Sequence, residues 1–111
     1  MIIAGVEFHD LPLVGIELSL NAKEVILTVQ PWDEKSNDHY LGKVHFKEVS
    51  KLDMDLLKID DLTDMEIASM DVIDNGARKK IEITILNGWS MPSTNLIFEC
   101  GSVHYSWQSS K

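Results

Sequence analysis

Apolar and polar residues alternate along most of the chain, and this alternation predicts strands. Between residues 14 and 20, every second residue is aliphatic and the residues between them are small or polar. A period of two is typical of a strand with one buried face and one solvated face. We therefore predict a strand over 14–20 whose aliphatic side chains face the core, namely Val14, Ile16, Leu18 and Leu20.

A second run, over residues 24–30, is rich in β-branched residues and follows a short segment with the composition of a turn, residues 21–23. These two runs predict a β-hairpin. Pro31 is expected to end the hairpin, because proline has no backbone N–H to donate to a neighbouring strand. The polar stretch from Trp32 to Tyr40 then predicts an exposed loop that is available for contact with a partner.

The rest of the chain repeats this pattern of strands and turns. Val44 and Phe46 alternate with lysine and histidine, which predicts a third strand. The turn sequence Asp74–Gly76 lies between two alternating runs, 67–73 and 81–85, and predicts a second hairpin. After further turn residues, a last long strand is predicted from residue 96 to residue 107.

The segment from Leu52 to Asp64 differs, because its apolar residues recur every three to four positions among aspartates. We expect a short helix or an irregular crossover there. The chain as a whole predicts one mainly β domain over residues 1–111, either a curved antiparallel sheet or a small two-layer β-sandwich, with about seven strands. The expected core includes Val25, Leu27, Val29, Phe46, Ile83, Ile85 and Phe98.

The charge of the chain narrows the choice of partner. The formal net charge is −8 and the isoelectric point is near 4.8. A nucleic-acid binder neutralises phosphates with clustered Lys and Arg, so nucleic acid is not expected as a partner. A negative field favours encounter with a basic protein, and it serves equally well to keep the protein in solution.

The acidic residues concentrate between Asp53 and Asp74, where eight carboxylates face one lysine and the net charge is −7. Their spacing does not match a calcium-binding EF-hand loop. The tract is therefore either a solvated face or a docking surface for Lys and Arg of a partner. For the second alternative, the candidate contact residues are Asp60, Asp61 and Asp64 together with two tryptophans in loop contexts, Trp32 and Trp89.

Residues with reactive side chains are few. Cys100 is the single cysteine, so it cannot form an intrachain disulfide. On a strand, Cys100 and His104 would lie roughly 13 Å apart, too far to share one zinc ion, and we expect a buried free thiol. We expect His9 to make a turn hydrogen bond, with Asp10 as one acceptor. No metal ligand set is predicted.

No enzyme motif is present in the sequence. It has neither a G-x-S-x-G nucleophile elbow nor a Walker or dinucleotide-binding glycine pattern, so we assign no catalytic residue and no cofactor. The alternative of a small enzyme or ligand-binding protein would use His9, His45 or His104 as an acid or base in a pocket. A third alternative is a structural subunit of an oligomer, which would expose a large apolar patch.

The N-terminal residues lack a basic leader and a long apolar stretch. We therefore expect neither a signal peptide nor a membrane-spanning segment. With a single cysteine, the chain is suited to a reducing compartment. We therefore expect a cytoplasmic protein with no membrane partner.

Several short segments, in this order, resemble small bacterial β-rich proteins that are grouped with the immunity proteins of polymorphic toxin systems. They are Phe8–Asp10, an apolar hairpin, Val44–Val49 and Leu96–Cys100. The resemblance implies a non-enzymatic cytoplasmic protein that neutralises a toxin by binding it. It implies no catalytic residue, and it does not identify the toxin.

Overall fold

The regular structure of the chain is entirely β in the computed structural model, which describes residues 2–3, 6–33, 35, 37–54, 65–86 and 93–108. The prediction of a mainly β, antiparallel fold is confirmed. Among the described residues, no helix has the length and apolar character needed to cross a membrane. The strands are β1 (Ile2–Ile3), β2 (Val6–Glu7), β3 (Leu11–Ser19), β4 (Glu24–Val29), β5 (Trp32–Asp33), β6 (Asp38–His39), β7 (Leu41–Lys47), β8 (Ser50–Met54), β9 (Glu66–Asn75), β10 (Arg78–Leu86), β11 (Ser93–Cys100) and β12 (Ser102–Gln108).

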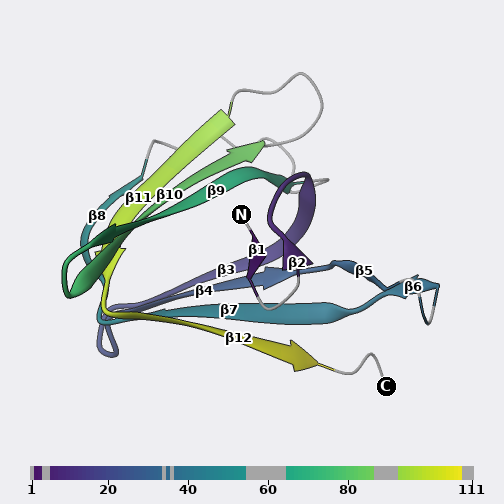
Figure 1. Cartoon of the computed structure of the whole chain (residues 1–111), viewed down its shortest axis with the longest axis horizontal. Coiled ribbons are helices and arrows are strands. Elements are labelled where there is room, and N and C mark those ends of the chain that lie inside the picture. Colours follow the sequence, from purple (N-terminus) through teal and green to yellow (C-terminus); the bar gives the residue numbers. More distant parts are fainter. Residues whose placement is uncertain are drawn as a thin grey trace.

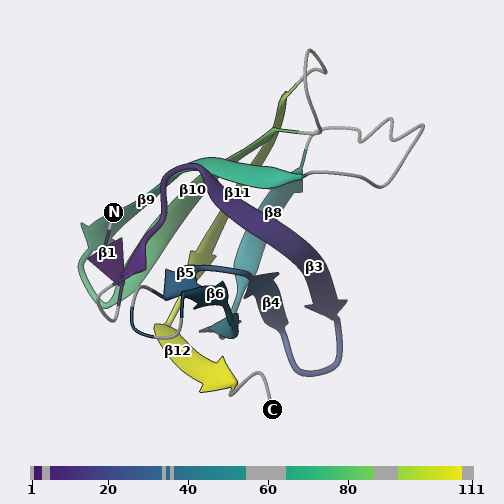
Figure 2. The ribbon, with the colours of Figure 1, turned by 90° about the vertical axis from the view of Figure 1, so that its right-hand side faces the viewer.

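Eight of these strands form one antiparallel sheet in the order β12-β7-β4-β3-β9-β10-β11-β8. The sheet is bent into two layers, with β9, β10, β11 and β8 in one and β3, β4, β7 and β12 in the other (Figure 1). Strand β3 joins the layers, because its first residues, Leu11 and Pro12, pair with Ile67 and Glu66 of β9 while the rest of it pairs with β4 (Figure 2). The remaining short strands form the separate pairs β1–β2 and β5–β6.

A second connection between the layers is a corner at which two neighbouring strands bend together. Strand β7 continues into β8 and β11 continues into β12, so the β7–β12 pair of one layer becomes the β8–β11 pair of the other. Glu48 and Lys51 have positive φ angles of 56° and 53° at this bend. Gly101 lies opposite, and a Cβ atom there would meet the Glu48 carboxylate, so a larger residue would require the exposed Glu48 side chain to move.

The core lies between the layers and contains all seven residues expected from the alternation. Each of them is at most 1% exposed. The rings of Phe46 and Phe98, one from each layer, meet edge to face with their centroids 5.0 Å apart. Phe8, Val44, Ile67 and Met70 complete the packing, among others.

The prediction for residues 14–20 is wrong in the residues that it buries. The strand exists as β3, but Leu11 and Leu13 are its buried residues, whereas Val14 and Leu20 are exposed. A break in register between Leu13 and Gly15 explains the difference, because one extra residue moves the following side chains to the other face. Ile16, opposite Leu27, packs against the margin of the core, whereas Leu18, opposite Val25, is exposed.

Three further predictions need correction. The single last strand expected over 96–107 is two strands, β11 and β12, which belong to different layers because the chain bends at Gly101. The expected loop over 32–40 contains a short strand pair, in which Trp32 lies opposite His39. In the expected helix or crossover from Leu52 to Asp64, residues 52–54 are part of β8 and pair with β11, so the first turn of a helix cannot form there. Residues 55–64 and the predicted turn over 87–92 lie outside the described residues.

Candidate partner-binding surface

A row of acidic side chains crosses the outer face of the β8–β9–β10–β11 layer. Asp71 of β9 lies directly opposite Glu82 of β10, Glu82 lies opposite Ile97 of β11, and Ile97 lies opposite Asp53 of β8. These four residues line a shallow hollow of about 260 Å³ together with Ser69, Thr84 and Asn95. We call Asp53, Glu82 and Asp71 the acidic row.

Within the described residues, the acidic row is only partly neutralised. Lys80 Nζ lies 3.5 Å from Glu82 Oε1, and both side chains are about half exposed, so this ion pair is weak. Asp53 and Asp71 form no ion pair with any described residue. Like charges directly opposite each other on neighbouring strands are destabilising. Among the described residues, this face therefore holds negative charge that no described cation pairs with.

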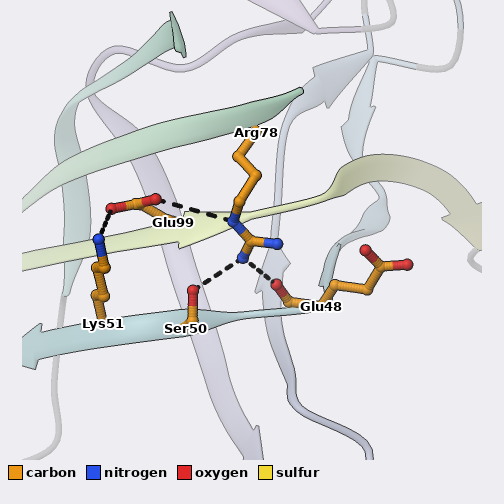
Figure 3. A network of polar contacts seen from close by, with 5 residues as sticks. All are labelled: Glu48, Ser50, Lys51, Arg78 and Glu99. Carbon is orange, nitrogen blue, oxygen red and sulfur yellow. Dashed lines mark hydrogen bonds and ion pairs between the residues drawn. The ribbon is translucent and has the colours of Figure 1, made fainter. Parts of the chain in front are cut away.

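Towards the corner, a network of polar contacts joins Glu99 to two cations (Figure 3). Arg78 of β10 donates from Nη2 to the backbone oxygen of Glu48 at 2.6 Å and to Ser50 Oγ at 2.9 Å. Its Nε lies 3.8 Å from the Glu99 carboxylate, which also accepts Lys51 Nζ at 3.2 Å. This network ties β10 and β11 to the bend between β7 and β8, so its role is to hold the corner together.

Asp74 belongs to the predicted acidic tract, but it forms an ion pair within the β9–β10 hairpin. Lys79 Nζ donates to Asp74 Oδ1 at 2.7 Å. This hydrogen bond, together with the charge of Asp74, raises the pKa of Lys79 above its ordinary value. Asp74 is therefore neutralised within the chain, unlike Asp71 three residues before it on the same strand.

The tryptophans of the described residues lie away from the acidic row. Trp32 is 51% exposed, and its ring meets His39 edge to face at 5.1 Å. Trp107 is 54% exposed and stacks on Tyr40 with ring centroids 4.2 Å apart. The prediction of an accessible Trp32 is confirmed, whereas the exposure of Trp107 was not predicted. The sequence signal for this exposure was the position of Trp107 at the end of the alternating run 103–107.

The ring of Tyr105 meets Trp107 edge to face with centroids 5.6 Å apart, and its buried hydroxyl group lies beside Tyr40. Burial raises the pKa of Tyr105 above its ordinary value, and the neighbouring Tyr40 adds to this rise. The hydroxyl occupies the space where a side chain at Gly42 would begin. Glycine at position 42 is thus required by the close approach of Tyr105.

The predicted contact residues Asp60, Asp61, Asp64 and Trp89 lie outside the described residues. From the same acidic tract, the structure brings Asp53 and Asp71 onto one face although they are 18 positions apart in sequence. Glu82 was missed because it lies beyond the tract, between Ile81 and Ile83. Its alternation with two buried isoleucines was the signal that it faces outward, but sequence alone could not show which strands lie beside it.

The remaining candidates for chemistry do not gather at one place. His9 lies near the expected carboxylate, with Nε2 3.4 Å from Asp10 Oδ2, but its Nδ1 makes a long-range contact, 2.6 Å from the carbonyl oxygen of Ala68 on β9. His45 and His104 lie opposite each other on β7 and β12. The prediction of a buried free thiol at Cys100 is confirmed, and burial raises the pKa of this thiol, which disfavours the reactive thiolate.

No group of three or more His, Cys, Asp or Glu side chains in the described part of the chain is arranged to hold a metal ion. Comparison with models of protein families, with curated proteins and with solved structures finds no significant match.

Proposed function

We propose that this protein is a non-enzymatic binding module that meets a basic partner protein through the acidic row. The observation that supports it is the cross-strand juxtaposition of Asp71 and Glu82, with Asp53 in the same row and no described cation beside Asp53 or Asp71. A lysine or arginine of a partner, placed in the hollow between these carboxylates, would relieve their repulsion. The binding energy would then include the relief of a cost that the free protein bears.

The net charge of −8 supports the same proposal over longer distances. A negative field steers a basic protein towards this face and speeds the encounter, and salt weakens that attraction. The resemblance to immunity proteins suggests the class of partner, a bacterial toxin that the module would inhibit by covering it. The proposal places this protein in the cytoplasm, where its single free thiol stays reduced.

The test begins with capture of a partner from a lysate of the source organism on the immobilised chain, followed by purification of the captured protein. Association rates are then measured for the wild type and for the triple variant Asp53→Asn/Glu82→Gln/Asp71→Asn. We expect the association rate to fall at least about tenfold between low and physiological salt. The triple variant should associate more slowly and should depend less on salt.

A matched control is Asp10→Asn/Glu17→Gln/Asp74→Asn, which removes the same number of charges at positions outside the acidic row. If both triple variants slow association equally, only net charge matters and the acidic row is not the contact surface. If neither variant nor salt changes the rate, the binding-module proposal in this form is wrong. Expression of the captured protein with and without this chain tests whether that protein is a toxin. Growth arrest that co-expression of this chain relieves would support an immunity role.

A further inference from the structure

A second surface of the molecule lies where β8 separates from the β3–β4 hairpin. At the bend before β8, the backbone N–H of Val49 donates to the carbonyl oxygen of Lys23 at 2.8 Å, which joins the strand to the hairpin turn. Beyond Val49, β8 pairs with β11 of the other layer, while the hairpin stays with its own layer. The two segments therefore diverge and leave a cleft between them.

One wall of this cleft is an unpaired strand edge. Strand β8 is the last strand of the eight-stranded sheet and is hydrogen-bonded to β11 on one side only. Within the described residues, no strand pairs with its other side. A free edge offers backbone N–H and C=O groups to any further strand that approaches it. All five residues of β8 are exposed, so side chains do not bury this edge.

The cleft itself is largely apolar. Leu18 and Leu52 lie on its opposite walls and are 43% and 41% exposed, and Val25 and Val49 line it between them. Its volume is about 160 Å³. Since a cavity of roughly 150 Å³ holds a benzene molecule, this cleft accommodates one side chain of the size of leucine or phenylalanine.

The charges at its rim favour an acidic occupant. Lys23 and Lys51 both line the cleft, against the single carboxylate of Glu24. Lys51 is 3.2 Å from Glu99, whereas Lys23 forms no ion pair with any described residue. Lys23 is therefore the cation of this rim that no described carboxylate pairs with. A carboxylate next to the anchoring side chain would pair with Lys23.

The backbone around the cleft is held in an uncommon conformation. Lys23, Glu48 and Lys51 have φ angles of 54°, 56° and 53°, in the left-handed region that non-glycine residues rarely adopt. Such conformations cost free energy and persist where the surrounding structure enforces them, frequently at sites of recognition. Two of these residues, Lys23 and Lys51, line the cleft, and Glu48 directly precedes Val49 of its lining.

We propose that this cleft binds an extended segment of another protein, which adds as a strand to the free edge of β8. The segment inserts one leucine- or phenylalanine-sized side chain between Leu18 and Leu52 and places a carboxylate beside Lys23. Main-chain hydrogen bonds to β8 supply affinity, and the cleft selects the side chain, as in other cases of strand addition. A second copy of this chain is not the occupant, because two molecules of net charge −8 repel each other.

The experiment uses a displayed library of random linear dodecapeptides, selected on the full-length wild-type protein. We expect the enriched sequences to share a leucine or phenylalanine next to an aspartate or glutamate. Hydrogen exchange of the complex should show new protection of the backbone amides of β8. Enriched peptides are then synthesised and their Kd measured by fluorescence anisotropy.

Two pairs of variants test the contacts. Leu52→Asp should weaken peptide binding about 30-fold or more, as expected for loss of a central apolar anchor, whereas Ile73→Asp on β9, which is equally exposed, should leave it unchanged. Lys23→Glu should weaken binding about fivefold, whereas Lys47→Glu should not. Circular dichroism and the unfolding midpoint of each variant establish that it is folded.

Several outcomes would overturn the proposal. These are enrichment of no peptide over an empty support, enriched peptides that bind Leu52→Asp as well as the wild type, and protection confined to strands other than β8. Dimerisation of the wild type that Leu52→Asp abolishes would assign the cleft to a second copy instead. The inference does not depend on the acidic row: Glu82→Gln/Asp71→Asn should leave peptide binding unchanged, so the two proposals fail separately.

Discussion

The corner network and the acidic row lie in the same layer of the sheet and share strands β8 and β10. In the corner network opposite charges are paired, whereas in the acidic row like charges face each other. At the corner, Arg78 and Lys51 neutralise Glu99, and Arg78 also binds the backbone of Glu48. In the acidic row, Asp71 faces Glu82 across the β9–β10 pair and forms no ion pair with a described residue, while Lys80 pairs only weakly with Glu82. Arg78 thus stabilises the fold, whereas Glu82, four residues later on β10, stays available to a partner.

The comparison shows how function can be recognised without a motif. Where charges are paired across strands, removal of one partner harms the protein itself. Where like charges face each other, their removal relieves the free protein and harms only binding. The sign of the stability change therefore separates the two kinds of surface.

The largest expected effect lies in the core beneath both surfaces. Phe46→Ala should lower the free energy of unfolding by about 3–5 kcal/mol, since it removes a fully buried ring packed on Phe98. Equilibrium denaturation measures this change. Ile73→Ala, at an exposed position of β9, is the control and should change it by less than about 0.5 kcal/mol. A small effect of Phe46→Ala would mean that the two layers do not pack as described.

The next largest effect tests the corner network. Arg78→Ala removes the donor to Glu48 O and Ser50 Oγ and should lower the free energy of unfolding by about 1–2 kcal/mol, since the side chain is partly exposed. Arg78→Lys keeps the charge but loses the forked geometry, so it should recover only part of this loss. Full recovery with lysine would show that charge alone holds the corner.

Removal of a charge from the acidic row should change the free energy of unfolding in the opposite direction. Asp71→Asn removes one of two like charges that face each other and should raise the free energy of unfolding by up to about 1 kcal/mol in low salt. Asp74→Asn, three residues along β9, loses its pair with Lys79 and should leave stability unchanged or lower. The two variants are compared by denaturation at low and high salt. Destabilisation by Asp71→Asn would contradict the difference in charge pairing between the corner network and the acidic row.

The smallest effect concerns Tyr105, away from both surfaces. Its pKa is raised in the folded protein, so the unfolded chain loses the tyrosine proton first as the pH increases. The contribution of Tyr105 is thus fully present below about pH 10 and is lost as the pH rises towards the folded pKa. Tyr105→Phe should change stability by less than about 1 kcal/mol near neutral pH and should flatten the alkaline loss. An unchanged alkaline profile would contradict the buried hydroxyl.

The sequence was sufficient for the strand class of the fold and for most of the core. Alternation with a period of two identified Val25, Leu27, Phe46, Ile83 and Phe98 as buried, because side chains of a strand point to opposite faces in turn and only apolar ones can be covered. It failed at β3, where a single extra residue near Val14 reversed the faces. Such a bulge depends on how β3 pairs with its neighbours, so alternation within the strand cannot reveal it.

Composition also determined that the protein is acidic and that its charge concentrates in one tract. Which carboxylates share a face was decided by tertiary structure alone, since Asp53, Glu82 and Asp71 meet only through the register of four strands. The cleft beside β8 was decided in the same way, by the divergence of β8 from the β3–β4 hairpin. Local sequence sets the direction of each side chain, but long-range strand pairing sets its neighbours.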